Sequence, residues 1–167
     1  MLKQKLQKDL NDSLKSGNQL KRLVLGMVMT AVKNKELGKR QQLSKTVSDT
    51  GELEKQSQLT DEEIIEVVAG EVKKRKESVE QFKAGGREEL AQKEKSEMDI
   101  LLAYLPEQIG EDEIRAEIQK TITELGPPAG GFSPKDMGKV IGAVMAKLKG
   151  RADGGLVSKI AKGLLQS

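Results

Sequence analysis

The most informative stretch of the chain is residues 133–157, SPKDMGKVIGAVMAKLKGRADGGLV. Ser133, followed by a proline and by Asp136, is a helix-start signal, because serine caps a helix N-terminus and an acid there favours the helix dipole. At about 100° per residue, the apolar side chains of residues 137–148 fall on one arc. Gly150 predicts a stop, and the aspartate three residues later predicts the cap of a second helix. The stretch therefore predicts two consecutive amphipathic helices.

The opposite arc of the first of these helices carries lysines separated by small residues. Lys135, Lys139 and Lys149 fall there, with Gly142 and Ala146 between them. Small residues let a bulky polyanion approach closely, so the ammonium groups are placed to hold phosphates. The ordinary alternative is that lysines on the solvent side of an amphipathic helix keep it soluble.

The distribution of charge favours the phosphate-binding interpretation. From residue 134 to the end the chain has seven basic and two acidic residues, whereas residues 111–126 have five acidic and two basic ones. A region polarised in this way is typical of a face that attracts polyanions.

Composition excludes several classes of protein. The 167 residues include 33% charged and 2% aromatic residues, which predicts an aliphatic core and a helical protein. The absence of cysteine and histidine excludes disulfides, the usual zinc sites and histidine-bearing triads. No convergent set of carboxylates stands out, so we expect no catalytic residue, no metal ligand and no cofactor.

The sequence predicts neither a membrane span nor a targeting segment. No run approaches the roughly 18 apolar residues that cross a bilayer. Residues 1–10 lack the apolar centre of a signal peptide and fit a transit peptide poorly. We therefore expect no membrane partner and a cytoplasmic location.

The first 58 residues predict a helical hairpin followed by an irregular segment. Leucines spaced by four predict a helix over 2–15, and a second pattern over 20–37 has a broad apolar face that includes Leu23 and Met27. The polar residues 38–58 predict a mobile loop or a partly frayed helix.

A long helix is expected next. Thr60 and Glu63 form a capping box, which marks its start. Its predicted buried face runs from Ile65 to Phe82, and the basic run at 73–76 is predicted mainly as a solvated face.

The remaining patterns predict a two-domain, all-α protein. A helix over 87–105 ends before Pro106, and residues 106–110 are the expected hinge. Three short helical patterns follow. The prediction is an N-terminal helical domain of helical hairpins over 1–106 and a three-helix C-terminal bundle over 107–167.

Several motifs together resemble the GatB/YqeY family, and in particular its stand-alone YqeY-like members. The resemblance covers nearly the whole chain, and only residues 38–58 depart from it by being longer and more polar than expected. The matching motifs are Lys135–Gly142 (KDMGKVIG), Lys149–Asp153 (KGRAD), Val157, Glu71–Ser78, Gly86–Arg87 and Tyr104–Gln108.

Membership would imply an all-helical N-terminal domain and a tail similar to the C-terminal domain of the B subunit of the tRNA-dependent glutamyl/aspartyl amidotransferase. Similar modules are appended to some glutaminyl-tRNA synthetases and are associated with tRNA binding. The resemblance thus implies tRNA as a partner, with an aminoacyl-tRNA synthetase or an amidotransferase as a further one. The family label is carbon–nitrogen ligase with glutamine as amido-N-donor, but nothing here corresponds to the catalytic domain of the B subunit.

The leading hypothesis is therefore a non-catalytic tRNA-binding or translation accessory module. Two alternatives stay open: an amidotransferase-like component acting with partner subunits, and a helical protein-interaction module. The residues expected to contact RNA are Lys135, Lys139, Gly142, Lys149, Arg151, Lys159 and Lys162.

Overall fold

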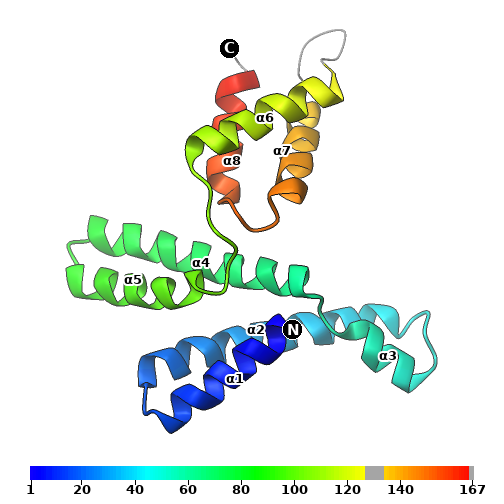
Figure 1. The fold of residues 1–167 in the computed structure, drawn as a ribbon, viewed down its shortest axis with the longest axis vertical. Coiled ribbons are helices and arrows are strands. Elements are labelled where there is room, and N and C mark those ends of the chain that lie inside the picture. Colours follow the sequence, from blue (N-terminus) through cyan, green and yellow to red (C-terminus); the bar gives the residue numbers. More distant parts are fainter. Residues whose placement is uncertain (127–133, 166–167) are drawn as a thin grey trace. The chain divides into compact units, whose positions relative to one another are not determined.

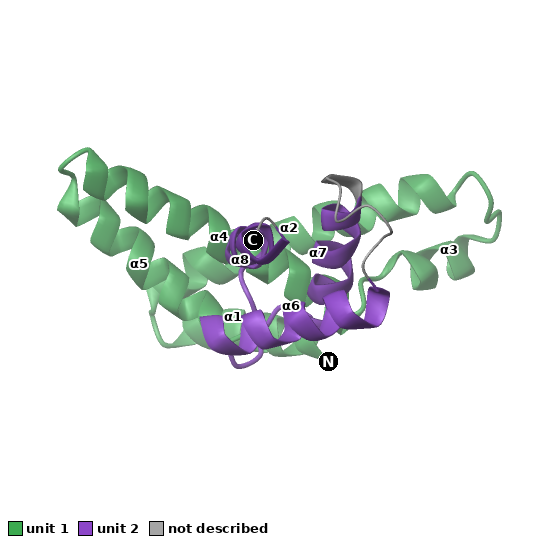
Figure 2. Ribbon diagram, turned by 90° about the horizontal axis from the view of Figure 1, so that it is seen from above, with its two compact units in different colours: residues 1–104 green, residues 105–167 purple. Residues whose placement is uncertain are grey.

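The computed structural model describes residues 1–126 and 134–165, which form eight helices and no strand (Figure 1). This confirms the predicted all-α class. Contacts divide the chain into two compact units, residues 1–104 and 105–167 (Figure 2). The helices are α1 (Leu2–Lys15), α2 (Gln19–Leu43), α3 (Thr50–Ser57), α4 (Asp61–Ala84), α5 (Glu88–Leu102), α6 (Glu111–Leu125), α7 (Pro134–Leu148) and α8 (Gly154–Leu165).

Helix α2 is the centre of the N-terminal unit. It contacts α1, α3, α4 and α5, while α4 and α5 form a hairpin of their own. The Asn18 side chain accepts a hydrogen bond from the N–H of Lys21 (3.0 Å), which fixes the start of α2 after the turn from α1. The core is aliphatic, as the composition predicts; its fully buried residues include Leu6, Val24, Leu25, Val28, Val32, Ile64, Val68 and Leu101.

Of the two alternatives predicted for residues 38–58, a mobile loop or a partly frayed helix, the structure is nearer to the second, because most of the segment is helical. Helix α2 continues to Leu43, and the eight-residue α3 follows. Helix α3 begins because the carboxylate of Asp49 accepts a hydrogen bond from the N–H of Glu52 (2.7 Å). The polar composition of residues 38–58 does not predict these helices. They are stabilised by a cap and by ion pairs, and neither of these produces an apolar period.

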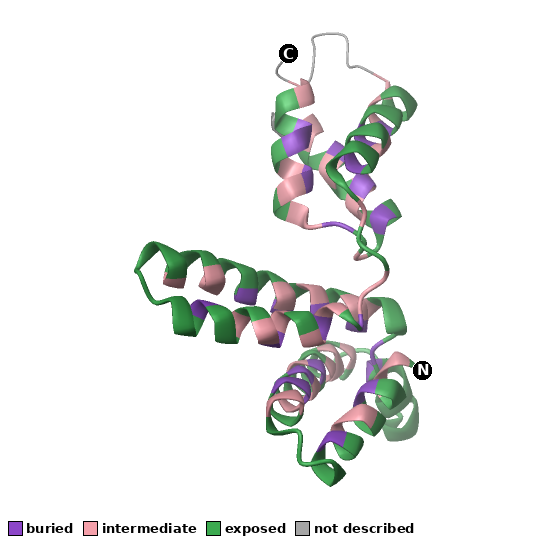
Figure 3. Ribbon diagram, turned by 60° about the vertical axis from the view of Figure 1, so that its left-hand side comes forward, coloured by how far each residue is buried: buried purple, intermediate pink, exposed green. Residues whose placement is uncertain are grey.

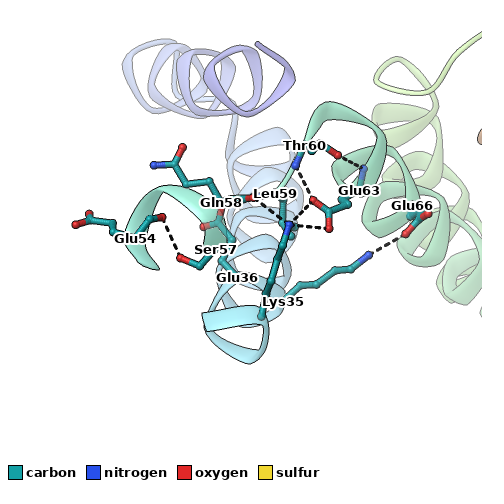
Figure 4. A network of polar contacts seen from close by, with 10 residues as sticks. Lys35, Glu36, Glu54, Ser57, Gln58, Leu59, Thr60, Glu63 and Glu66 are labelled. Carbon is teal, nitrogen blue, oxygen red and sulfur yellow. Dashed lines mark hydrogen bonds and ion pairs between the residues drawn. The ribbon is translucent and has the colours of Figure 1, made fainter. Parts of the chain in front are cut away.

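The extension of α2 is held by polar contacts with the start of α4 (Figure 4). The Lys39 ammonium lies 3.0 Å from the Glu63 carboxylate, and Lys35 lies 2.9 Å from Glu66. Glu36 accepts a hydrogen bond from the N–H of Leu59 (3.1 Å). The capping box at Thr60 is confirmed: the two hydrogen bonds between Thr60 and Glu63 measure 2.8 and 3.2 Å.

The buried face of α4 differs from the predicted one. Val68 is buried as predicted, but the other buried residues are Ile64, Glu71 and Arg75, while Ile65 and Phe82 are only half-buried. The physical reason is that α4 packs against α5, α2 and α1. Which of its residues are buried therefore depends on these neighbouring helices as well as on the positions of its apolar residues. Consequently Arg75, predicted within a solvated basic run, is only 4% exposed.

Arg75 is the centre of a buried ionic network. Its Nε donates to Glu97 of α5 (3.2 Å), and its Nη1 donates to the carboxylate of Glu71 (2.9 Å). Its Nη2 lies 3.8 Å from the sulfur of Met27 in α2. Burial raises the pKa of Glu71, but hydrogen bonds from Lys74 and Arg75 outweigh it and leave the pKa below its usual value. The network therefore joins α2, α4 and α5 through charged groups.

The C-terminal unit is a three-helix bundle in which α6, α7 and α8 pack pairwise. Its buried side chains alternate with exposed ones along each helix (Figure 3). The core consists of Ile114, Ile118, Val140, Val144, Leu148, Ala152, Val157, Ile160 and Ala161.

The segment before α6 is hydrogen-bonded into this bundle. The N–H of Ile109 donates to the carbonyl of Arg151 (2.9 Å), and the side chain of Gln108 donates to the carbonyl of Gly150 (2.8 Å). Ile109 also packs against the tail core. The predicted hinge at 106–110 thus lies within the tail unit, which begins at Leu105.

Candidate nucleic-acid interface

The predicted outer face of α7, with its lysines and small residues, is described by the structure from residue 136 onward. Ser133, the predicted cap, lies outside the described residues, and so does the side chain of Lys135. Within α7 the inner line is Val140, Val144 and Leu148, all buried. The division of α7 into a core face and an opposite face is therefore as predicted from residue 136 onward.

The outer face of α7 carries lysine together with small residues that leave the backbone accessible. Lys139 is 75% exposed and pairs with Asp136 at 3.5 Å, a surface pair of the kind that contributes little. Gly142 and Ala146 are exposed. A Cβ placed on Gly142 would meet no neighbouring atom within 4 Å, and the same holds for Gly138, which the sequence interpretation missed although it lies one turn earlier. The spacing of four residues could have identified it.

Lys149 stands just after the end of α7 rather than within it. Its N–H donates to the carbonyl of Met145 (3.1 Å), and its φ of 41° places it in the left-handed region, followed by Gly150 with φ of 80°. This conformation costs an L-residue roughly 1–2 kcal/mol relative to glycine. A lysine therefore occupies a position that glycine would fill with less strain.

We expect Lys149→Gly to stabilise the tail relative to Lys149→Ala by about 1 kcal/mol, since both lose the side chain and only glycine relieves the backbone. Hydrogen exchange of the α7 and α8 amides measures this difference. Equal protection in the two variants would contradict the strain at Lys149.

Arg151 is partly engaged in structure. Its Nε donates to the carbonyl of Glu107 (3.4 Å), and its Nη2 lies 4.0 Å from the carboxylate of Glu113. The side chain remains 47% exposed. It can therefore face an anion while also holding the segment that leads into α6.

The remaining predicted cations lie on α8. The carboxylate of Asp153 accepts a hydrogen bond from the N–H of Leu156 (2.9 Å), so the predicted cap is confirmed. Lys159 and Lys162 are both exposed, on the side of α8 opposite Val157 and Ala161. Of the predicted residues, Lys139 and Gly142 thus lie on α7, Lys149 and Arg151 in the turn after it, and Lys159 and Lys162 on α8.

Lys147 is not one of the residues predicted to contact RNA, and acids of α6 bind it. Its ammonium lies 2.6 Å from the carboxylate of Glu124 and 3.1 Å from that of Glu117. Hydrogen bonds to Glu124 and then Glu117 raise the pKa of Lys147. The acidic helix therefore neutralises one cation at the side of α7 and leaves the outer face basic.

The described residues hold no group of three or more acids that could bind a metal ion. No helix within residues 1–126 and 134–165 combines the length and apolarity that a bilayer span requires.

The comparisons with known proteins concern the whole chain. The profile of the Yqey-like protein family matches residues 3–165. The chain is 32% identical over 103 residues to "Altered inheritance of mitochondria protein 41, mitochondrial" of Pyrenophora tritici-repentis, covering 60% of this chain and 54% of that protein. It is 42% identical over 48 residues to an uncharacterized protein of Schizosaccharomyces pombe, covering 29% of this chain and 39% of the relative.

The chain thus spans about half or less of the length of these curated relatives. The family profile, by contrast, covers nearly all of both compact units, including α7 and α8. The chain belongs to the Yqey-like protein family.

Proposed function

We propose that this protein is a non-catalytic tRNA-binding module that holds tRNA phosphates on the basic outer faces of α7 and α8. The observation that carries the proposal is the outer face of α7, where Lys139 lies near an exposed and unobstructed Gly142, with the exposed Lys149 following just after the end of the helix. Phosphates bind where ammonium groups are accessible and the backbone can be approached closely.

Two further features support this proposal. The Glu117 and Glu124 carboxylates of α6 bind Lys147, while Lys139 on the outer face of α7 has only a weak surface pair with Asp136. Lys149 keeps a cation in a backbone conformation that favours glycine, and strain of this kind often accompanies function. An aminoacyl-tRNA synthetase or an amidotransferase is the partner proposed to receive the bound tRNA.

The compartment is also a proposal. The sequence predicts the cytoplasm, whereas the Pyrenophora relative has a mitochondrial name. Both compartments contain tRNA, so the proposed binding mode is the same in either.

Gly142→Glu tests the proposal. It places a negative charge between the lysines, and glutamate is the better helix former by about 0.5 kcal/mol. We expect tRNA affinity to fall on the order of tenfold, while the melting temperature holds or rises. Fluorescence anisotropy with a panel of purified tRNAs, at several salt concentrations, measures the change.

Gly70→Glu is the matched control. Gly70 is an exposed glycine inside α4, and a Cβ there also meets nothing within 4 Å. The change in net charge and in helix propensity is the same, yet tRNA affinity should be unaltered. A folded Gly142→Glu protein that binds tRNA as tightly as the Gly70→Glu control would refute the proposed face.

A further inference from the structure

The outer face of α2 carries an apolar ridge that the N-terminal unit leaves uncovered. Leu23, Met27 and Leu37 are 52%, 46% and 54% exposed. At about 100° per residue they lie within one arc of the helix, with Thr30 between them. The Thr30 hydroxyl donates to the carbonyl of Gly26 (2.9 Å), so its polar group is satisfied inside the helix. The sequence places Leu23 and Met27 on a broad apolar face, and the structure leaves both side chains about half exposed on it.

An open groove of about 960 Å³ runs beside this ridge, between α2 and α4. Leu23, Gly26, Met27 and Ala31 line it from α2, and Lys74 lines it from α4. Small residues between larger ones leave spaces into which the side chains of a second helix can insert. The weak contact between the Met27 sulfur and the buried Arg75 ties the ridge to the ionic network below it.

A row of cations runs along one side of the ridge, and its first member, Arg22, also lines the groove. Arg22, Lys33 and Arg40 are separated by 11 and 7 residues, so they lie along one side of α2 over about 27 Å. Their side chains form no hydrogen bond or ion pair with any described residue, whereas each of the other three basic residues of α2 binds an acid of a neighbouring helix. Glu36 and Glu71, the carboxylates nearest the ridge, are already bound to Lys3 and to Arg75.

We propose that the ridge and groove of α2 dock an amphipathic helix of a partner protein, with that helix placing its acidic residues along Arg22, Lys33 and Arg40. Half-exposed leucine and methionine beside small residues match the anchor pattern of helix-in-groove recognition. Unpaired arginine and lysine on the rim supply charge complementarity to an acidic partner.

Two other occupants fit the surface less well. A nucleic acid would leave the apolar ridge against phosphates and water, although the cations suit it. A second copy presenting the same face would bring two rows of cations together, which is unfavourable. An acidic amphipathic helix can both cover the apolar ridge and pair its carboxylates with the row of cations.

The test uses a phage-displayed library of helical peptides of about 18 residues, selected on the full chain. The enriched peptides should combine an apolar stripe at spacings of three and four with aspartate or glutamate beside it. Synthetic versions of these peptides should bind at least tenfold more weakly to the variants Leu23→Ser/Leu37→Ser and Arg22→Gln/Lys33→Gln/Arg40→Gln. The loss of affinity in the variant that lacks the three cations should be smaller at high salt. These variants leave the Met27 contact with Arg75 intact.

Leu90→Ser is the control, because Leu90 is an exposed leucine of α5 in the same unit; it should not change the affinity. Peptides without an acidic bias, or equal binding to all variants, would overturn the proposal. So would a loss of tRNA binding in the Arg22→Gln/Lys33→Gln/Arg40→Gln variant, which would assign the surface to RNA. Self-association abolished by Leu23→Ser/Leu37→Ser would assign it to a second copy.

Discussion

Replacing Arg75 with alanine is expected to destabilise the N-terminal unit by about 3–5 kcal/mol, because it leaves the buried Glu97 carboxylate without its cation and leaves Glu71 with Lys74 alone. Glu71 and Glu97 are 9% and 6% exposed, and both bind the Arg75 guanidinium. Urea unfolding followed by tyrosine fluorescence measures this loss, since Tyr104 is the single tyrosine of the chain and is buried in this unit.

Lys74→Ala is the matched control for Arg75→Ala. Lys74 also binds Glu71, at 2.7 Å, but its side chain is 72% exposed. Its removal should therefore cost no more than about 0.5–1 kcal/mol. A second variant, Glu71→Leu/Arg75→Met/Glu97→Leu, removes all three charges and should be close to the parent in stability. If Arg75→Ala unfolds no more easily than Lys74→Ala, the network contributes nothing to the unit.

The second large effect concerns the tail. Replacing Lys135, Lys139 and Lys149 with glutamine should lower tRNA affinity on the order of 100-fold at physiological salt, and should reduce the slope of log affinity against log salt by about 2.7 if each lysine neutralises one phosphate. The fold should be retained, because substitutions of this kind on a surface usually change stability by no more than about 0.5 kcal/mol.

Lys83, Lys93 and Lys95 provide the control set for this experiment. All three are exposed lysines of the α4–α5 hairpin, so their replacement with glutamine changes the net charge equally. The tail variant should lose affinity and slope together, and the control variant should change little. An equal effect in both would mean that tRNA responds only to the total charge of the protein.

Much of the fold could be predicted from the sequence because local signals agree with packing. The leucine period of α1 predicts a helix, the capping box at Thr60 predicts the start of α4, and the isoleucines of α6 predict both a helix and its inner side. The capping of α8 by Asp153 followed from the same local rules.

The rest depends on contacts between distant residues. Nothing near Gly38 indicates that Lys39 will meet Glu63 and extend α2, and no apolar period indicates α3. Arg75 looked like one member of a basic run, and only the approach of Glu97 from α5 buries it. The half-exposed Leu23 and Met27 lie on an apolar face in the sequence, and periodicity identifies such a face but not whether another helix of the chain covers it.

The same distinction applies to the tail. Periodicity predicted the outer face of α7, including the exposed Lys139 and Gly142. The left-handed conformation of Lys149 and the engagement of Arg151 with Glu107 depend on how the turn after α7 is built, and the residue types there did not indicate them.

The hydrogen bonds from Gln108 and Ile109 to the turn at Gly150 and Arg151 have a mechanical consequence. Tension on the chain at Leu105 reaches these two bonds before it reaches α6, so the turn acts as the anchor of the tail. A pulling force would therefore deform the turn that carries Lys149 and Arg151 while the helices stay folded. The proposed contact of Lys149 and Arg151 with a polyanion would therefore depend on the same few backbone bonds that take up strain in the connecting segment.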